Sequence, residues 1–314
     1  MVNAMNRTSR LRALIEGNKP VLCPGVYDCL SAMIVERGGA PCAIVSGAAV
    51  TASRLGYPDV GLQTMVEILD QVRNIARSVN IPIIADVDTC YGNALNVMRT
   101  VREFEGAGAA GIFFEDQTFP KKCGHFEGTD VIPTEEMIIK IRAAREARTS
   151  QDFILIARTD ARAKYGLQEA IERGRAYASA GADVIFVEAL LSEDELREVG
   201  RAIDAPLQAN IVEGGKTPNI DVQKLFDMGF KLISHSGTLQ RTAIAGMRAS
   251  LRTLQTEGHT RSLGPEKMCD VVDRSALLGL HRFYEFEERM YGRIKESGGS
   301  WRDELARRAK ASPA

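Results

Sequence analysis

Residues 104–116 read Phe-Glu-Gly-Ala-Gly-Ala-Ala-Gly-Ile-Phe-Phe-Glu-Asp, and this stretch decides the fold. A glycine-rich helix end leads into a short apolar run, and the run closes on two acids. Residues 177–189, Tyr-Ala-Ser-Ala-Gly-Ala-Asp-Val-Ile-Phe-Val-Glu-Ala, follow the same pattern. A repeated unit of helix end, tight turn and buried strand is typical of a chain built from successive βα units.

Short apolar runs of this kind recur along the chain, and a polar or charged residue ends each one. They are 42–45 ending at Ser46, 81–85 ending at Asp86 and Asp88, 112–114 ending at Glu115 and Asp116, 153–157 ending at Arg158, 184–187 ending at Glu188, 206–209 ending at Asn210, and 230–233 ending at His235. Continuous apolar runs indicate strands buried on both faces of a parallel sheet. With residues 21–24 as the first strand the set reaches eight. Eight short units favour a closed (β/α)8 TIM-type barrel over an open doubly wound sheet.

Helical periodicity fills the intervals between the strands, at 64–79, 94–107, 134–148, 167–180 and 192–203. The predicted organisation is an N-terminal helical arm at 1–20, a barrel catalytic domain at 21–257, a C-terminal helical extension at 258–297 and a polar tail at 298–314. The extension carries Phe283, Tyr284 and Phe286. An aromatic surface beyond the end of a barrel needs a covering partner, which favours a contact with a neighbouring subunit over packing on the same barrel.

Composition excludes several classes of partner. The chain has 314 residues, 45% hydrophobic and 26% charged, with a net charge of −1. The absence of a strong field of one sign argues against nucleic acid or a membrane surface as partner. No apolar run reaches the roughly 18 residues of a spanning helix, and the first 20 residues lack the apolar core of a signal peptide. Scattered cysteines without metal spacing predict reduced thiols in a cytoplasmic protein.

Acids gather at the predicted strand ends, where a barrel places its active site. Asp86 and Asp88 lie two residues apart, and Glu115 and Asp116 end the next strand. Such acids often cap helices or pair with Lys and Arg. Four of them beside Arg158 favour instead a Mg²⁺ site and an anionic substrate. We expect the guanidinium of Arg158 to hold a substrate carboxylate through two parallel hydrogen bonds.

The loop at 119–128, Phe-Pro-Lys-Lys-Cys-Gly-His-Phe-Glu-Gly, is the other informative segment. Cys123 is flanked by Lys121, Lys122 and His125, and positive charge of this kind predicts a lowered thiol pKa and proton exchange near neutral pH. Gly124 and Gly128, which both follow Cys123, give the backbone the freedom to close over a ligand as a lid. A zinc site is disfavoured because no further ligands stand at a usual spacing.

Taken together, these motifs resemble the isocitrate lyase and phosphoenolpyruvate mutase superfamily over residues 20–295. The matching segments are Pro24-Gly25-Val26-Tyr27-Asp28, Ser46-Gly47, Pro58-Asp59, Asp86-Val87-Asp88-Thr89, Glu115-Asp116-Gln117, Lys121-Lys122-Cys123-Gly124-His125, Ala157-Arg158-Thr159-Asp160-Ala161, Glu188-Ala189, Asn210, and Glu213-Gly214-Gly215-Lys216-Thr217-Pro218. The chain looks closest to the short lyases for methylisocitrate, 2,3-dimethylmalate and, in the petal death protein group, 2-alkylmalates. The resemblance implies a last helix swapped between subunits, usually of a homotetramer.

The resemblance also implies the reaction, a Mg²⁺-dependent cleavage of a small-molecule carboxylate. A 2-hydroxy di- or tricarboxylate, such as a 2-alkylmalate or 2-methylisocitrate, would yield pyruvate and a second carboxylate, with Mn²⁺ as the alternative ion. The implied metal-site residues are Asp59, Asp86, Asp88 and Glu115. The residues implied to bind the substrate carboxylate next to the 2-hydroxyl group are Ser46, Gly47, Ala48 and Arg158. Cys123 would protonate the carbanion, and the residues implied to stabilise the second fragment are Lys121, Gly124, His125, Glu188 and Asn210.

Three positions depart from the usual pattern of these lyases. Ile44 stands where a tyrosine is common, and Cys90 replaces a usual glycine. Ser236 ends the stretch Ser234-His235-Ser236, which differs from the apolar-proline pattern of many of these lyases, and a hydroxyl there is reminiscent of relatives that hydrolyse oxaloacetate. An oxaloacetate hydrolase giving oxalate and acetate, or a carboxyphosphonoenolpyruvate phosphonomutase, therefore remains as an alternative activity. A non-enzymatic scaffold is disfavoured because the acids and Cys123 are all present.

Overall fold

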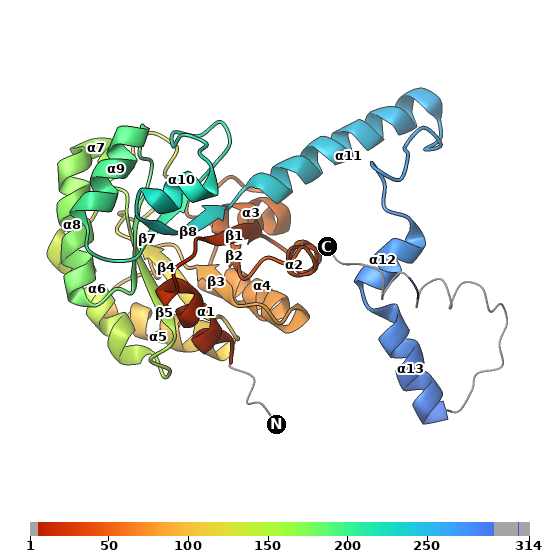
Figure 1. The fold of residues 1–314 in the computed structure, drawn as a ribbon, viewed down its shortest axis with the longest axis horizontal. Helices are drawn as coiled ribbons and strands as arrows, with labels where there is room; N and C mark the ends of the chain where they lie inside the picture. The colour runs from red at the N-terminus through yellow and green to blue at the C-terminus, as the bar shows by residue number, and fades with distance from the viewer. Residues whose placement is uncertain (1–5, 292–306, 308–314) are drawn as a thin grey trace. The chain divides into compact units, whose positions relative to one another are not determined.

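The computed structural model describes residues 6–291 and residue 307 of the chain. Eight parallel strands follow one another in sequence order, and β8 pairs with β1 to close the barrel (Figure 1). The strands are β1 (Val21–Val26), β2 (Ala43–Val45), β3 (Ile83–Asp86), β4 (Gly111–Glu115), β5 (Ile154–Thr159), β6 (Val184–Val187), β7 (Leu207–Asn210) and β8 (Phe230–His235). The predicted TIM-type (β/α)8 barrel is confirmed.

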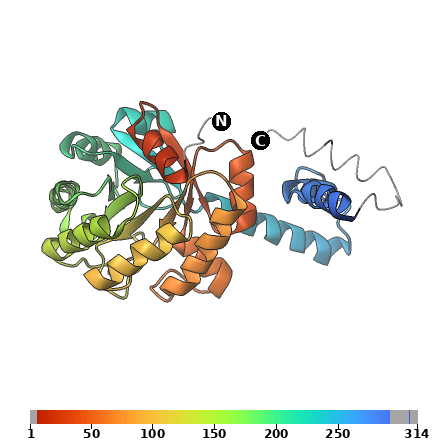
Figure 2. The same cartoon turned by 90° about the horizontal axis from the view of Figure 1, so that it is seen from below.

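Helices precede, alternate with and follow the strands in sequence, and those that alternate with the strands surround the barrel, as a second view shows (Figure 2). They are α1 (Arg7–Glu16), α2 (Cys29–Arg37), α3 (Gly47–Val50), the π-helical turn η1 (Thr51–Leu55), α4 (Met65–Ser78), α5 (Ala94–Gly106), α6 (Thr134–Ala147), α7 (Arg162–Tyr165), α8 (Leu167–Ala180), α9 (Glu193–Ala202), α10 (Val222–Asp227), α11 (Thr238–Glu257), α12 (Val271–Leu277) and α13 (Leu280–Tyr291). The five helices predicted from periodicity agree with α4, α5, α6, α8 and α9 to within one residue at each end.

Strand register brings the polar strand ends to one edge of the barrel. Glu115 on β4 is in register with Arg158 on β5, and Glu188 comes directly after β6. Asp86 on β3 is in register with Phe113, two residues before Glu115. All of these side chains therefore belong to the C-terminal edge, the edge at which barrel enzymes hold their substrates.

Helix α1 belongs to the opposite end of the barrel. Leu11 and Ile15 are buried in one apolar cluster with Val21, the first residue of β1. Lys231 on β8 donates through its Nζ to the carbonyls of Gly17 and Lys19, just beyond the helix. Apolar packing and two hydrogen bonds thus fix this segment against the strand starts, away from the polar edge.

The chain divides into two compact units, Met1–Ala32 with Ala40–Gln240, and Met33–Gly39 with Arg241–Ala314. The predicted boundaries at 20, 257 and 297 remain predictions, and residues 292–306 and 308–314 of the extension and tail lie outside the described part. No helix within the described residues is long and apolar enough to cross a membrane. The exposed large apolar side chains of α11 and α13 are Met247, Leu251, Leu254, Phe283, Phe286 and Met290.

Candidate active site

Four acids come together from three segments at the C-terminal edge. Asp86 ends β3, Asp88 lies two residues beyond it, Glu115 ends β4, and Asp59 lies between η1 and α4. The Nζ of Lys121 bridges two of them, 2.7 Å from Asp59 Oδ1 and 2.6 Å from Asp88 Oδ1. The structure therefore brings the four predicted metal-site acids into one cluster and adds a lysine to it.

Burial raises the pKa of Asp86, Asp88 and Glu115. It raises the pKa of Asp86 to about 7, with Asp88 and Asp59 adding to the shift and Lys121 opposing it. Burial also raises the pKa of Glu115 well above its usual range, against the nearby charges of Arg158 and Lys121. A carboxylate without enough compensating charge takes up a proton instead of ionising.

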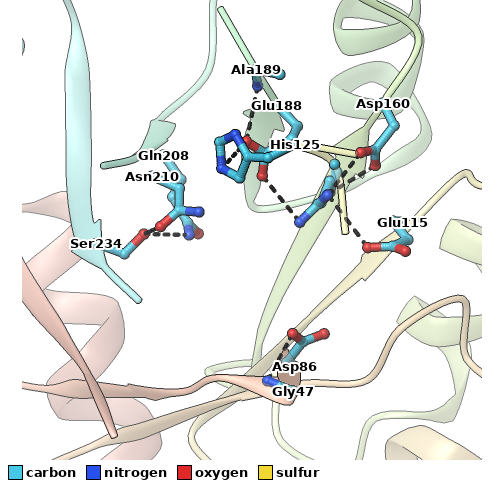
Figure 3. Close-up of polar contacts among 12 residues, drawn as sticks. Gly47, Asp86, Glu115, His125, Asp160, Glu188, Ala189, Gln208, Asn210 and Ser234 are labelled. Atoms are coloured by element: carbon cyan, nitrogen blue, oxygen red, sulfur yellow. Dashed lines mark hydrogen bonds and ion pairs between the residues drawn. The ribbon is translucent and has the colours of Figure 1, made fainter. Parts of the chain in front are cut away.

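Two of the acids suit a divalent cation. Glu115 Oε1 is buried and accepts no hydrogen bond from any described residue. Asp86 Oδ2 accepts only the 3.0 Å hydrogen bond from Gly47 N among the described contacts (Figure 3). Buried oxygens of this type match the hard donors that Mg²⁺ takes, usually one or two carboxylates with several waters. Within the described residues, no three His, Cys, Asp or Glu side chains already stand as a metal-ligand set. The four-acid magnesium site therefore remains a prediction.

Arg158 contacts three carboxylates, those of Asp160, Glu188 and Glu115, which Figure 3 labels. Its Nε and Nη2 donate to the two oxygens of Asp160 at 2.8 and 2.7 Å, and its Nη1 lies 3.1 Å from Glu188 Oε2. Glu115 Oε2 is 3.4 Å from Nε. The paired hydrogen bonds expected for a substrate carboxylate are thus made with Asp160. Any substrate group must use the remaining N–H bonds of the guanidinium.

The lid, residues 117–131, lies over this cluster with its ends paired at Gln117 and Val131. Cys123 N donates to the Asp59 carbonyl at 3.1 Å, so the thiol-bearing turn is tied to the acid-bearing segment. A Cβ at Gly124 would stand 2.6 Å from Arg158 Nη2 and 2.6 Å from Glu188 Cγ. Glycine is therefore required there for close approach of the lid to the site.

His125 and Lys216 fasten the far side of the lid. His125 Nδ1 accepts from Lys216 N at 3.3 Å, and Lys216 Nζ donates to the Gly124 carbonyl at 3.2 Å. His125 Nε2 lies 3.7 Å from Glu188 Oε1. The predicted residues His125, Glu188 and Gly124 thus form one group, and Lys216 joins them from the segment after β7.

The thiol of Cys123 does not follow the predicted electrostatics. Burial raises its pKa, and the charges of Asp59 and Glu188 raise it further against the backbone hydrogen bond from His125 and the charge of Arg158. The expected lowered pKa is wrong because burial raises the pKa of the thiol, and the charge of Lys121 is paired with Asp59 and Asp88. The thiol is consequently protonated at neutral pH, which is the form that a proton donor needs.

The segment after β2 presents backbone groups to the acids. Ser46 Oγ caps α3 by accepting from Ala49 N at 3.3 Å, and Gly47 N donates to Asp86. Ala48 is half-buried beside them. In this structure the hydroxyl of Ser46 and the N–H of Gly47 serve the protein itself, so their predicted contacts with a substrate carboxylate remain predictions.

Polar residues of β7 and β8 complete the edge. Asn210 Oδ1 lies 3.2 Å from Ser234 Oγ, which accepts from Gln208 Nε2 at 3.1 Å (Figure 3). Ser236 is half-buried just beyond β8, and a Cβ on Gly25 would stand 2.2 Å from its carbonyl oxygen. The structure thus joins Asn210 to the barrel interior and places Ser236 at the same edge through its backbone.

Comparison with known proteins identifies the family of the chain. The family model described as phosphoenolpyruvate phosphomutase matches residues 11–255. The chain belongs to the phosphoenolpyruvate mutase and isocitrate lyase superfamily. The resemblance drawn from the sequence motifs is confirmed.

Two superfamily members show the extent of the similarity in sequence. The petal death protein of Dianthus caryophyllus is 44% identical over 284 residues, which cover 90% of this chain and 89% of that protein. The 2,3-dimethylmalate lyase of Eubacterium barkeri is 40% identical over 283 residues, 90% of this chain and 98% of the lyase.

Solved structures of the superfamily match nearly the whole chain. Oxaloacetate acetylhydrolase in complex with 3,3-difluorooxalacetate has a TM-score of 0.87 and 35% identity, covering 92% of this chain and 100% of that one. Phosphonopyruvate hydrolase in complex with oxalate and Mg²⁺ has a TM-score of 0.83 and 30% identity, with coverage of 92% and 100%.

One departure from the superfamily pattern has a structural explanation. Cys90 has a φ of 60°, and its neighbour Tyr91 has a φ of 61°. Backbone in this left-handed region favours glycine, which accounts for the usual glycine at position 90. The Cys90 thiol is fully buried, and burial raises its pKa, so it does not act as a second exposed thiol.

Asp160 and Lys216 contact the site but were not selected from the sequence, although both lie in motifs quoted for the superfamily. Asp160 follows Arg158 by two residues, and that spacing on a strand places two side chains on the same side. Strand periodicity is therefore a signal that would have identified the Arg158 partner. No comparable signal marks Lys216, since its contacts depend on how two loops meet.

Proposed function

We propose that this protein is a Mg²⁺-dependent carbon–carbon lyase that cleaves a 2-hydroxy di- or tricarboxylate to pyruvate and a second carboxylate. The substrate is a 2-alkylmalate or resembles 2-methylisocitrate. The observation that carries the proposal is the Cys123 thiol, whose pKa burial raises, on a lid that packs against Arg158 and Glu188 beside buried acids. The names of the petal death protein and 2,3-dimethylmalate lyase relatives support the same class of substrate.

In this proposal the cluster of Asp59, Asp86, Asp88 and Glu115 binds the metal ion. Asp86 and Glu115 would be the direct ligands of the ion, and Asp59 and Asp88 would bind it through water. Mg²⁺ in such a site lowers the pKa of a substrate hydroxyl and offsets carboxylate charge. The phosphonopyruvate hydrolase solved with oxalate and Mg²⁺ supports magnesium over manganese as the first ion to test.

Other residues of the chain orient the substrate and supply a proton. Arg158, with the backbone near Ser46, Gly47 and Ala48, orients the carboxylate next to the hydroxyl-bearing carbon. The C2 hydroxyl gives its proton to a carboxylate of the acid cluster, its oxygen forms the carbonyl of pyruvate as the C2–C3 bond breaks, and the electron pair of that bond stays on C3 of the second fragment. Cys123 donates its Sγ proton to this carbanion.

Hydrogen-bond donors around the second carboxylate fragment stabilise the negative charge that develops on it during cleavage. Those that we assign are Lys121, Gly124, His125 and Asn210, with Glu188 holding His125 and Arg158. The closed lid excludes water, and fixed donors in a water-poor site stabilise developing charge more strongly than donors in solution. Closure also protects the carbanion from side reactions.

Pyruvate release with Mg²⁺ tests the proposal directly. The panel holds 2-methylmalate, 2,3-dimethylmalate, 2-methylisocitrate and isocitrate, with a chelator control and with Cys123→Ser as the matched variant. We expect pyruvate from one alkylmalate or methylisocitrate, loss of the signal with chelator, and a fall in kcat of about a hundredfold or more for Cys123→Ser. Near-normal turnover by Cys123→Ser would remove the thiol from the mechanism.

Oxaloacetate hydrolysis is the second candidate, because Ser236 places a hydroxyl-bearing residue at the end of β8. The structural similarity to oxaloacetate acetylhydrolase supports it. Oxaloacetate consumption with release of oxalate and acetate, without pyruvate from any malate, would establish this activity. Ser236→Ala would then abolish it and leave the fold intact.

We further propose a homotetramer in the cytoplasm. The exposed apolar side chains of α11 and α13 support burial against neighbouring subunits, and helix exchange would provide it. All of the cysteines are free thiols, which suits a reducing compartment.

A further inference from the structure

A buried polar cluster lies next to the site and has no place in the reaction above. Asp116, fully buried, follows Glu115 at the end of β4. Its Oδ1 accepts from the backbone N–H of Asp160 at 2.9 Å, and its Oδ2 accepts from the Tyr177 hydroxyl at 2.7 Å and from Arg173 Nη1 at 3.2 Å. Both donors belong to α8, so a helix on the outside of the barrel determines where this carboxylate stands.

Asp116 acts on Arg158 through Asp160. Asp160 binds Arg158 with both of its oxygens, and its own backbone N–H is held by Asp116. Asp116 N also donates to the Arg158 carbonyl at 3.2 Å. A displacement of the Asp116 carboxylate would therefore shift Asp160 and rotate the guanidinium plane of Arg158.

The same cluster holds the rear end of the lid. Ile132, the first residue after the lid, donates from its N–H to the Asp116 carbonyl at 2.8 Å. Its carbonyl accepts from Arg173 Nη1 at 2.9 Å, the same atom that contacts the Asp116 side chain. Both hydrogen-bonding groups of Ile132 are thus bound, one by Asp116, which also binds Asp160, and the other by Arg173, which binds Asp116.

We propose that Asp116, Arg173 and Tyr177 are positioning residues, which hold the Arg158–Asp160 pair and the rear end of the lid in one geometry. Alignment of Arg158 and closure of the lid are then a single event. Only the kinetic test of this inference rests on the proposed lyase function.

The charge pattern of Arg173 supports a positioning role. Its Nη1 faces the buried cluster, and its Nε is 2.7 Å from Glu169 Oε1, a more exposed carboxylate on the same helix. The guanidinium therefore joins a half-exposed acid to a fully buried one. A planar side chain with donors in fixed directions can hold both partners, whereas the single ammonium of a lysine cannot.

Four variants test the proposal. Tyr177→Phe removes one donor to Asp116, Arg173→Met removes the charge, and Arg173→Lys keeps the charge without the planar fork. Arg175→Met is the matched control, because Arg175 is an exposed residue of the same helix that donates to the Ala202 carbonyl instead.

Trypsin cleavage within the lid provides a readout that needs no substrate. Lys121 and Lys122 lie in the lid, and opening exposes the bonds after them. We expect Arg173→Met to accelerate this cleavage about tenfold relative to cleavage elsewhere in the chain, and Tyr177→Phe to accelerate it less. Arg173→Lys should restore part of the protection, and Arg175→Met should behave as the parent protein.

Kinetics provide the second readout. We expect kcat to fall about tenfold in Arg173→Met with a smaller change in KM, since misalignment affects the transition state more than ground-state binding. Unchanged lid cleavage and unchanged kcat, with only a lower midpoint of guanidinium unfolding, would overturn the proposal and leave the cluster a structural feature. If no substrate is turned over by the parent protein, the proposed function fails, and lid cleavage alone decides the positioning role.

Discussion

Arg158 stands among Asp160, Glu188 and Glu115, and its single positive charge makes their close approach tolerable. The carboxylates in turn outweigh the effect of burial and raise the pKa of Arg158 above its already high ordinary value. Its side chain also lies over the ring of Phe186, with Cζ 5.2 Å from the ring centroid. Removing the charge would leave buried carboxylates without a partner.

Arg158→Met is therefore expected to lower the free energy of unfolding by about 3–5 kcal/mol and to abolish activity. The matched double variant Arg158→Met/Asp160→Asn should recover much of this stability without recovering activity. Urea unfolding followed by circular dichroism measures the first effect. Equal stability of the single variant and the parent would contradict the charge argument.

The raised pKa of Cys123 makes a second prediction, on alkylation by iodoacetamide. Only the thiolate reacts, so a pKa raised by burial lowers the reactive fraction at every pH below it. We expect the midpoint of the rate-against-pH curve to lie above that of the same cysteine in urea-unfolded protein, whose pKa is about 8.5. Mass spectrometry of the Cys123 peptide follows the rate. A midpoint at or below the unfolded value would show that the lysines and the histidine control the thiol after all.

Residue types and spacing were enough to identify the acids, Arg158 and the thiol loop as members of one site. Sequence spacing could not predict which of these groups are charged, because burial and ion-pair partners in the folded chain determine their pKa values. Lys121 is an example. It lies two residues before Cys123 in the sequence, but in the structure it forms ion pairs with Asp59 and Asp88. Asp160 is another, because an acid two residues from an arginine can be a metal ligand, a cap or an ion-pair partner.

At the scale of elements, strands and helices were predictable because the burial of one face or of a whole strand leaves a regular pattern of apolar residues in the sequence. Apolar runs located all eight strands, and periodicity located five of the barrel helices to within one residue at each end. Loops carry no period, so the contacts of Lys216 with the lid and the positive φ of Asp88, Cys90 and Tyr91 were beyond sequence reasoning.

The lid offers the sharpest prediction for a single element. In Gly124→Ala the added Cβ would overlap Arg158, Glu188 and Asp160, all within 2.7 Å, so the lid cannot reach its closed position. We expect turnover to fall about a hundredfold, in keeping with a displacement of about 1 Å at a reacting group. The barrel does not depend on the lid, so the unfolding midpoint should stay near that of the parent. Glu127→Ala, on the exposed part of the same loop, is the control, and equal loss in both variants would point to lid disorder instead of the clash.

At the scale of the whole molecule, α11 and α13 carry apolar side chains that are exposed to solvent in a single copy of the chain. Phe283 is 65% exposed and Phe286 54%. Exposed apolar surface of this kind marks interfaces between subunits. Because nothing in one sequence states how many copies assemble, this is the part of the molecule about which the chain by itself says least.

We expect the protein to sediment as a tetramer at micromolar concentration, and the double variant Phe283→Glu/Phe286→Glu to sediment as smaller species. Two charges placed in an apolar interface would have to be desolvated, which opposes assembly. Arg282→Glu, a charge change in the same helix, serves as the control. A parent protein that sediments as a monomer would contradict the proposed assembly, and an unchanged tetramer in the double variant would place the interface elsewhere.

The burial of Asp86, Asp88 and Glu115 has a practical consequence for finding ligands. Holding these acids away from water costs the folded chain stability, as their raised pKa values record. A molecule that binds only the folded form raises its melting temperature, by an amount that grows with ligand concentration over Kd. A dye-based melting screen of small organic acids, each with and without magnesium, would therefore rank candidate substrates before any product is known. Acids that raise the melting temperature only when the metal is present would be the first to carry into an activity assay.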